Sequence, residues 1–147
     1  GLYYVREHEK SITTFPGDGW VNTGDLFTRD EDDYFWYVAR ADDMVKVSGV
    51  WVSPLEIEHH LQDYPDVEEC AAVGVKDEDG LMTIAAFVVL KEGVEVSAKT
   101  QDVLKRFCKE HLAPHKAPGA VEFMAELPKT GQGKIDRRQL REGTRQP

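Results

Sequence analysis

The chain has 147 residues, which is enough for one domain of ordinary size or for a small domain and part of another. A hydrophobic share of 41% allows a packed core, while 27 acidic against 18 basic side chains give a formal net charge of -9. This charge argues against nucleic acid or an anionic membrane surface as the main partner. Basic residues nevertheless concentrate between residues 129 and 145, a distribution that suits a local anion site.

The cysteine and histidine content predicts no metal site. The two cysteines, Cys70 and Cys108, lie far apart, and no Cys-x-x-Cys motif or Cys/His cluster accompanies them. We expect two buried, reduced thiols in a cytoplasmic protein, since no signal peptide and no long apolar span is visible. The adjacent His59 and His60 would point in different directions on a helix, so both are predicted at the surface. The chain starts at Gly1 without a methionine, from which we expect a piece of a longer protein.

The first predicted element is a β-hairpin. A short strand at Trp20-Val21 should break at Thr23-Gly24. Residues 34–39 should pair with that strand after an acidic turn at 30–33. Asp25 follows the break directly, and its carboxylate either stabilises the turn or accepts hydrogen bonds from the hydroxyls of a ligand, such as a ribose diol.

A second hairpin follows a candidate domain boundary. Residues 40–44 are polar and charged and come directly after a strand, so they form a connection. Residues 45–52 alternate in hydrophobicity and carry Ser48-Gly49 at their centre, which predicts a hairpin with a tight turn. In that turn Gly49 would supply a positive φ angle.

Helices and buried strands make up the rest of the chain. Ser53 should cap a helix that has Pro54 at its first position and Glu56 completing a capping box. The later predictions are strands at 67–75 and 81–90, a helix at 97–112 capped by Ser97, a strand at 120–124 and a short helix at 137–142. These elements predict an α+β fold, with a β-hairpin and a central antiparallel three-stranded sheet covered by helices.

A glycine-rich turn near the end of the chain carries one lysine at its tip. It consists of Lys129-Thr130-Gly131-Gln132-Gly133-Lys134. Its permissive backbone can bend closely around a ligand while Lys134 delivers an ammonium group. The P-loop spacing is absent, because Ile135 stands where serine or threonine would be required. The residues alone leave two interpretations: a solvated turn before a terminal helix, or a site for phosphate or carboxylate.

Four stretches occur in a recognisable order along nearly the whole chain. They are residues 19–25, beginning Gly-Trp-Val-Asn-Thr-Gly-Asp; residues 40–49; residues 112–118; and residues 127–134. Each motif is weak, but the four in this order resemble the C-terminal part of the adenylate-forming superfamily of acyl-CoA synthetases, peptide adenylation domains and luciferases. Residues 46–54 and 112–116 are most similar to the benzoate-CoA ligase branch.

The resemblance implies two domains and a set of site residues. Residues 1–41 would be the last piece of a large N-terminal AMP-binding domain, and residues 42–147 a small mobile domain that rotates about a hinge at Asp42. The remainder of the large domain would be its partner within the same chain. The implied site residues are Asp25 and Arg40 for ATP and the acyl adenylate, Lys134 for catalysis of adenylation, and Lys46, Ser48 and Gly49 for the CoA pantetheine tunnel.

The implied activity is that of an ATP-dependent acid–thiol ligase acting on a small carboxylic acid, an aryl acid such as benzoate. It would use ATP, CoA and Mg²⁺, with Mg²⁺ bound mainly by the missing domain, and the isolated chain should be inactive. Two alternatives are a non-catalytic binding or regulatory module and a parent enzyme that serves a carrier-protein thiol. Acetylation of Lys134 by a lysine acetyltransferase would remove the charge that adenylation needs.

Two positions depart from the benzoate-CoA ligase pattern. His115 stands where tyrosine is more common, and Gly119 stands where a basic residue is common. Arg137 and Arg138 are candidates to supply that missing charge to the CoA phosphates. In this chain we expect the turn that carries Lys134 to be exposed rather than poised, and disorder of the turn is left open.

Overall fold

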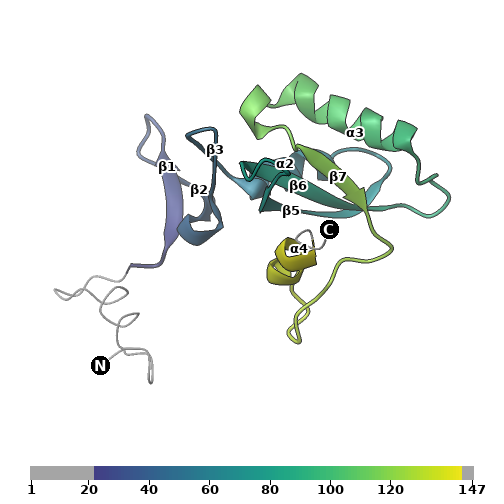
Figure 1. Cartoon of the computed structure of the whole chain (residues 1–147). Coiled ribbons are helices and arrows are strands. Elements are labelled where there is room, and N and C mark those ends of the chain that lie inside the picture. Colours follow the sequence, from purple (N-terminus) through teal and green to yellow (C-terminus); the bar gives the residue numbers. More distant parts are fainter. Residues whose placement is uncertain (1–21, 144–147) are drawn as a thin grey trace. The chain divides into compact units, whose positions relative to one another are not determined.

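The computed structural model describes residues 22–143 (Figure 1). These residues belong to two compact units, which divide between Asp43 and Met44. No helix in the described part of the chain is long and apolar enough to cross a membrane.

The first unit contains an antiparallel hairpin. Its elements are β1 (Asp25–Arg29), β2 (Phe35–Arg40) and the short 3-10 helix η1 (Ala41–Asp43). The predicted partner of the second strand is therefore wrong: β2 pairs with β1, and Trp20-Val21 lies outside the described residues. β1 begins directly after Thr23-Gly24, where the predicted strand was expected to end. Gly24 adopts a φ of +74° there and turns the chain into β1.

The predicted acidic turn is the connection between these two strands. One oxygen of Asp30 accepts hydrogen bonds from the backbone N–H groups of Asp32 at 3.0 Å and Tyr34 at 2.9 Å. Its other oxygen accepts from the indole N–H of Trp36 at 2.6 Å. These bonds, the one from Trp36 foremost, lower the pKa of Asp30. The Asp30 carboxylate thus stabilises the turn together with the backbone hydrogen bonds of Asp30 to Tyr34 and of Asp33 to Asp30.

The second unit begins with a two-stranded hairpin and continues as a three-stranded sheet with helices. The hairpin is β3 (Val45–Val47) with β4 (Val50–Val52). The later elements are α2 (Pro54–Gln62), β5 (Val67–Lys76), β6 (Met82–Leu90), α3 (Ala98–His111), the 3-10 helix η2 (Pro114–Lys116), β7 (Ala120–Phe123) and α4 (Arg137–Gly143). The predicted α+β class is confirmed.

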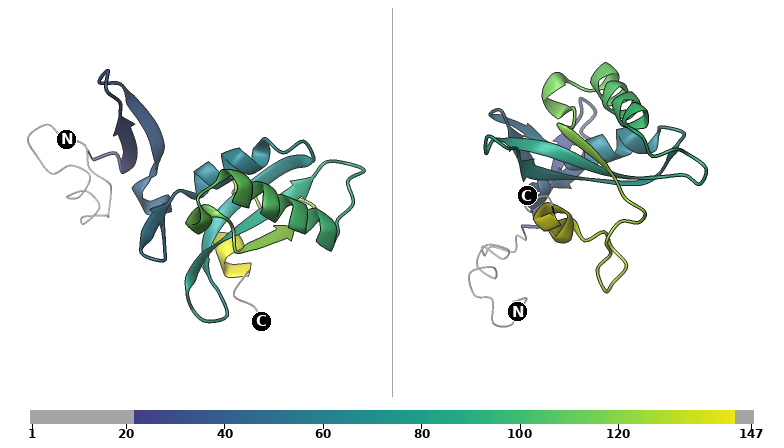
Figure 2. Two further views of the ribbon diagram at one scale, coloured as in Figure 1. Left: turned by 90° about the horizontal axis from the view of Figure 1, so that it is seen from above. Right: turned by 45° about the vertical axis from the view of Figure 1, so that its right-hand side comes forward.

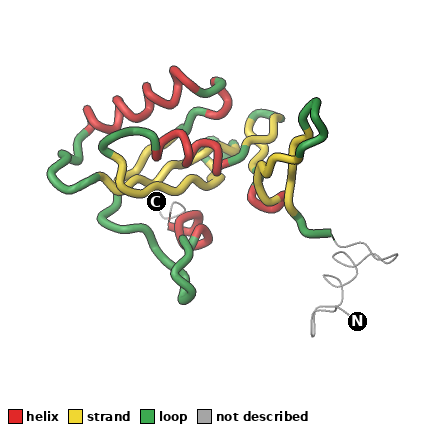
Figure 3. The backbone as a smooth tube through the Cα atoms, turned by 180° about the vertical axis from the view of Figure 1, so that it is seen from behind, coloured by secondary structure: helices red, strands yellow, loops and turns green. Residues whose placement is uncertain are grey.

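The three-stranded sheet is mixed, with the order β5-β6-β7. Its strands are among the yellow segments of Figure 3. β5 and β6 are antiparallel, as predicted, but β7 runs parallel to β6, with Ala120 opposite Ala85. The expectation of a wholly antiparallel sheet is therefore wrong. The reason is helix α3, which crosses between β6 and β7 and returns the chain to the end of the sheet where β6 began.

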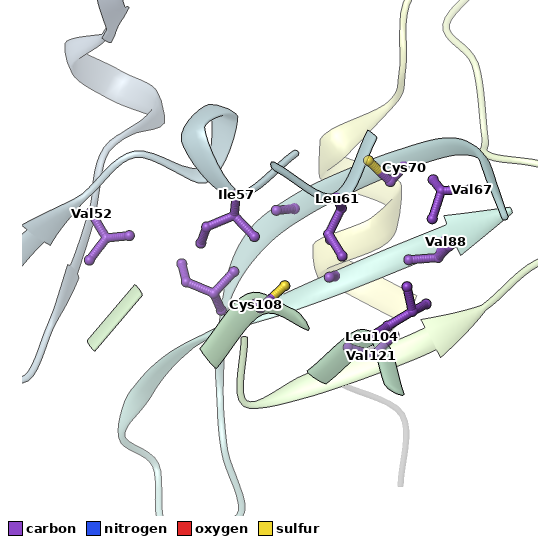
Figure 4. Close-up of a cluster of buried hydrophobic side chains, with 12 residues drawn as sticks. Val52, Ile57, Leu61, Val67, Cys70, Val88, Leu104, Cys108 and Val121 are labelled. Atoms are coloured by element: carbon purple, nitrogen blue, oxygen red, sulfur yellow. The ribbon is translucent and has the colours of Figure 1, made fainter. Parts of the chain in front are cut away.

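Helices cover both faces of this sheet (Figure 2). Because side chains alternate along a strand, Cys70 and Ala72 face α2 and α3, while Ala71 and Val73 face α4. The first cluster contains Val52, Ile57, Leu61, Val67, Cys70, Val88, Leu104, Cys108 and Val121, among others (Figure 4). Burial on both faces explains why β5 and β6 are nearly continuous apolar runs.

The two longer helices start differently from each other. Ser97 caps α3 as predicted, since its side chain accepts a hydrogen bond from the Thr100 N–H at 3.2 Å. Ser53 makes no such bond at the start of α2, and its buried hydroxyl has no partner in the described part of the chain. The predicted capping box is therefore wrong. The Glu56 carboxylate instead forms an ion pair with the Lys116 ammonium, at 2.9 Å, and Lys116 is distant in the sequence.

The predictions are confirmed for both cysteines and for His59, but not for His60. Cys70 and Cys108 are both buried free thiols, as expected. His59 is exposed, but His60 is half-buried and stacks on Phe107 with ring centroids 4.4 Å apart. The surface prediction is thus wrong for His60, because α3 packs beside α2 and covers that ring.

Candidate functional site

The glycine-rich turn with Lys134 is a closed, hydrogen-bonded structure. Lys129 and Ile135 form an antiparallel bridge, and the Thr130 N–H donates to the Lys134 carbonyl at 2.7 Å. The Thr130 hydroxyl oxygen accepts from the Lys134 N–H at 3.3 Å. Gly133 adopts a φ of +79°, which the tight return of the chain requires. The Lys134 side chain is exposed, as expected, and it stands on a defined turn.

Both ends of this turn are anchored to the body of the second unit. Leu127 and Leu140 are buried in the cluster between the sheet and α4. Before the turn tip, the Lys129 ammonium forms an ion pair with Glu69 of β5. After it, the Arg137 guanidinium forms an ion pair with Glu58 of α2. The lysine is therefore presented from a base that is fixed on either side.

The ion pair of Glu58 and Arg137 joins a buried carboxylate to a half-buried guanidinium within a small polar network. Glu58 is only 7% exposed, and one of its oxygens accepts from the Ala72 N–H at 2.7 Å. Arg137 donates from both terminal nitrogens to the two Glu58 oxygens, with 3.0 Å for Nη2 to Oε2. Its Nη1 also donates to the Ala72 carbonyl at 3.1 Å. The Arg137 guanidinium is thus bound to Glu58 and Ala72, and its suggested contact with CoA phosphates stays a prediction.

Sequence reasoning did not identify Glu58. The signal that could have found it is its position in the buried stripe of α2, where Pro54, Ile57 and Leu61 are the other members. A carboxylate on an apolar stripe requires a cationic or hydrogen-bonding partner when the helix packs. The sequence does not say which of the basic residues is that partner, because Arg137 lies 79 positions away.

The turn of the β3–β4 hairpin projects the residues predicted for the pantetheine tunnel. Val47 and Val50 pair across two residues with positive φ, Ser48 at +50° and Gly49 at +84°. This confirms the predicted tight turn and the conformational need for glycine. Ser48 and Gly49 are exposed, and a Cβ added at Gly49 would meet no atom within 4 Å. The Lys46 ammonium lies 5.8 Å from the centroid of Trp51.

Asp25 and Arg40 lie side by side in the first unit. They are paired residues of the β1–β2 ladder, and Arg40 Nε is 3.8 Å from Asp25 Oδ1. Arg40 also donates to the Thr23 carbonyl at 3.1 Å. Asp42 lies in η1, directly after β2, and is exposed. Asp25, Arg40 and Asp42 thus belong to one unit, whereas Lys134 and the β3–β4 turn belong to the other.

No group of three or more His, Cys, Asp or Glu side chains converges on a metal position within residues 22–143. Asp25 and Arg40 together offer one carboxylate and one guanidinium. This set suits sugar hydroxyls and phosphate oxygens better than a bare cation, since a cation prefers several oxygen ligands.

Comparison with known families identifies the class of the second unit. The model of the AMP-binding enzyme C-terminal domain matches residues 56–134, and the chain belongs to this family. The matched segment runs from α2 through the turn that carries Lys134.

Several similar proteins are named as CoA ligases. A benzoate–CoA ligase of Thauera aromatica is 44% identical over 95% of this chain, and a 4-hydroxybenzoate–CoA/benzoate–CoA ligase of Rhodopseudomonas palustris is 41% identical over 96%. The solved benzoate CoA ligase of Burkholderia xenovorans LB400 matches 95% of the chain with a TM-score of 0.83 and 43% identity. The chain spans 26% of each of the first two relatives and 27% of that structure, about a quarter in each case.

Proposed function

We propose that this chain is the C-terminal part of an ATP-dependent acid–thiol ligase that forms an acyl adenylate and then a CoA thioester. The observation that carries the proposal is Lys134, an exposed lysine on a closed turn whose two ends are anchored in the protein. Aryl acids are the proposed substrates, because two similar relatives are named for benzoate or 4-hydroxybenzoate.

The chemistry of adenylation explains why one lysine matters. A carboxylate oxygen attacks the α-phosphorus of ATP, an acyl–phosphate bond forms, and pyrophosphate leaves with the electron pair of the broken bond. Both reactants are anions, so an ammonium that contacts carboxylate and phosphate oxygens lowers the barrier and orients them. Lysine suits this task because its charge is compact and its stem is long.

The first unit would bind the nucleotide in this proposal. The Asp25 carboxylate can accept hydrogen bonds from a ribose diol, and Arg40 beside it can donate to ribose or phosphate oxygens. Mg²⁺ would neutralise the phosphates and be held mainly by the large domain, of which residues 1–41 would be the last piece.

Rotation of the second unit would connect the two half-reactions. Asp42 would be the hinge, and the movement would replace Lys134 at the adenylate with the turn that contains Gly49. CoA thiol would then attack the acyl carbon, AMP would leave, and the thiol proton would pass to solvent. Lys46, Ser48 and Gly49 would line the pantetheine tunnel.

Exposure of Lys134 also supports a regulatory role. A lysine acetyltransferase would neutralise its charge and switch off adenylation.

The deciding experiment separates the half-reactions in the full-length enzyme. Lys134→Ala should lower acid-dependent pyrophosphate exchange by about 100-fold or more, yet leave thioester formation from supplied acyl adenylate intact. Lys99→Ala removes an exposed lysine of α3 and is the matched control, with both rates unchanged. Equal loss of both half-reactions in Lys134→Ala would contradict the assignment.

Two further measurements test the class of acid substrate and whether the isolated chain is active without the large domain. Pyrophosphate exchange should be faster with aryl acids than with acetate or fatty acids, and the reverse order would overturn the substrate class. The isolated 147-residue chain should show no adenylation, and a measurable acid-dependent rate would contradict the proposal.

A further inference from the structure

We propose that Glu58 is a positioning residue for adenylation, acting through Arg137 on the turn that carries Lys134. The inference rests on the proposed function, since it assigns to Lys134 the role described above. Glu58 itself is buried in α2 and would touch no substrate.

The geometry links Glu58 to Lys134 by a short path. Arg137 is the first residue of α4 and stands three positions after Lys134. Its guanidinium binds both Glu58 oxygens and the Ala72 carbonyl, so three acceptors on α2 and β5 hold one planar group. A guanidinium held in this way has a defined orientation, which an ammonium with its freely rotating donors would not have.

The path between Arg137 and Lys134 is itself restrained. The Asp136 N–H donates to the Pro128 carbonyl at 2.8 Å, which closes the base of the turn. The Asp136 side chain accepts from the Gln139 N–H at 3.0 Å and so begins α4. Arg137 lies between these two restraints, and a shift of its backbone would move the base of the turn.

The energetic reason lies in the burial of Glu58. A glutamine at this position carries no charge and offers one acceptor oxygen in place of two, so the Arg137 guanidinium would be held less firmly. Because the residue is fixed in the packed stripe of α2 between Ile57 and Leu61, the adjustment would fall on Arg137 and on the turn. Displacement of a catalytic group by about 1 Å can cost on the order of 100-fold in rate.

The test is Glu58→Gln in the full-length enzyme. This substitution keeps the size of the side chain and removes its charge. We expect pyrophosphate exchange to fall roughly 10- to 100-fold, mainly in kcat, because Lys134 would be misplaced while the nucleotide contacts remain. Thioester formation from supplied acyl adenylate should be unchanged.

A double variant tests whether the effect passes through Lys134. In the Lys134→Ala background, Glu58→Gln should lower adenylation no further, since residues that act as a unit are not additive. An additional loss equal to that of Glu58→Gln alone would overturn the inference.

Controls separate positioning from a general loss of structure. Glu56→Gln is the matched control: it is on the same helix and paired with Lys116, but its side chain is 46% exposed against 9% for Glu58, and both half-reactions should be unchanged. If Glu58→Gln does not fold, Arg137→Lys keeps the charge but removes the planar fork, and it should show the same selective loss. An equal loss of both half-reactions in whichever of these variants folds would overturn the inference.

The two proposals can fail separately. If Lys134→Ala leaves adenylation intact, the proposed function of the lysine is wrong. If Lys134→Ala abolishes adenylation while Glu58→Gln and Arg137→Lys retain it, only the positioning role of Glu58 is wrong.

Discussion

Gly74 of β5 packs directly against Val45 of β3. A Cβ added at Gly74 would lie 2.7 Å from one Val45 methyl group and 2.8 Å from the other. Val45 also packs against the first core cluster, and its strand leads to the turn at Ser48-Gly49. The absence of a side chain at Gly74 therefore lets the hairpin approach the sheet and sets the base from which its turn projects.

Replacing Gly74 should destabilise the second unit. Gly74→Val would place methyl groups where Val45 and the end of Met82 already lie, and overpacking of this kind typically costs about 1–3 kcal/mol. The measurement is the denaturant midpoint of the chain, followed by circular dichroism, with the slope of the transition unchanged.

Gly143→Ala is the control for this prediction. A Cβ there would meet no atom within 4 Å, and the residue has no positive φ. Its effect on stability should stay within about 0.5 kcal/mol. Equal midpoints for Gly74→Val and the unmodified chain would show that β3 can move away without cost.

Gly49→Ala should separate backbone strain from an effect on thioester formation. The φ of +84° makes any side chain at this position cost about 1–2 kcal/mol. In the full-length enzyme, the added methyl would also narrow the proposed pantetheine tunnel. We expect thioester formation from supplied acyl adenylate to fall at least about 10-fold, with adenylation retained.

Gly93→Ala provides a matched comparison for Gly49→Ala. Gly93 has a φ of +85°, and a Cβ there also meets nothing within 4 Å, but it lies between β6 and α3. Both variants should lose similar stability, while only Gly49→Ala should slow thioester formation. If the two variants slow it equally, the effect is strain alone and the tunnel assignment for Gly49 fails.

The two cysteines should be unreactive in the native protein. Burial raises the pKa of Cys70 to about 12 and that of Cys108 to about 11, and the nearby Glu58 charge adds to the effect at Cys70. The reactive thiolate is therefore scarce at pH 8. Neither thiol should be alkylated before denaturant is added, and both should be alkylated afterwards.

The same pKa values predict how stability depends on pH. The folded state keeps both thiols protonated above the ordinary pKa of 9.0, where the unfolded chain releases those protons. The contribution is thus fully present below pH 9 and is lost as the pH rises from 9 towards 11 and 12. Denaturant midpoints at pH 7.5 and pH 10 measure the loss, which should shrink in the Cys70→Ala, Cys108→Ala double variant. An unchanged pH dependence in that variant would contradict the prediction.

Features that depend on neighbouring residues were predictable from the sequence. The turn at Ser48-Gly49 and the cap at Ser97 follow from local φ preferences and from hydrogen bonds within three or four residues. The buried strand at 81–90 follows from its apolar run, and the exposed Lys134 from the glycine-rich segment around it. In each case the physical cause acts within a few positions of the residue.

Features that depend on distant residues were not predictable in this way. The missing cap at Ser53 and the pairing of Glu56 with Lys116 depend on a contact 60 positions away. The parallel direction of β7 depends on where α3 crosses the sheet.

The turn with Lys134 shows both kinds of cause in one site. Its two glycines and its lysine after a proline are neighbours in the sequence, and these residues determine that an ammonium stands on an exposed turn. The anchors of that turn were decided only in the folded structure, where Glu69 of β5 pairs with Lys129 and Glu58 of α2 pairs with Arg137. The reason is physical: a buried carboxylate selects its cation by proximity and burial, which exist only after the chain has packed.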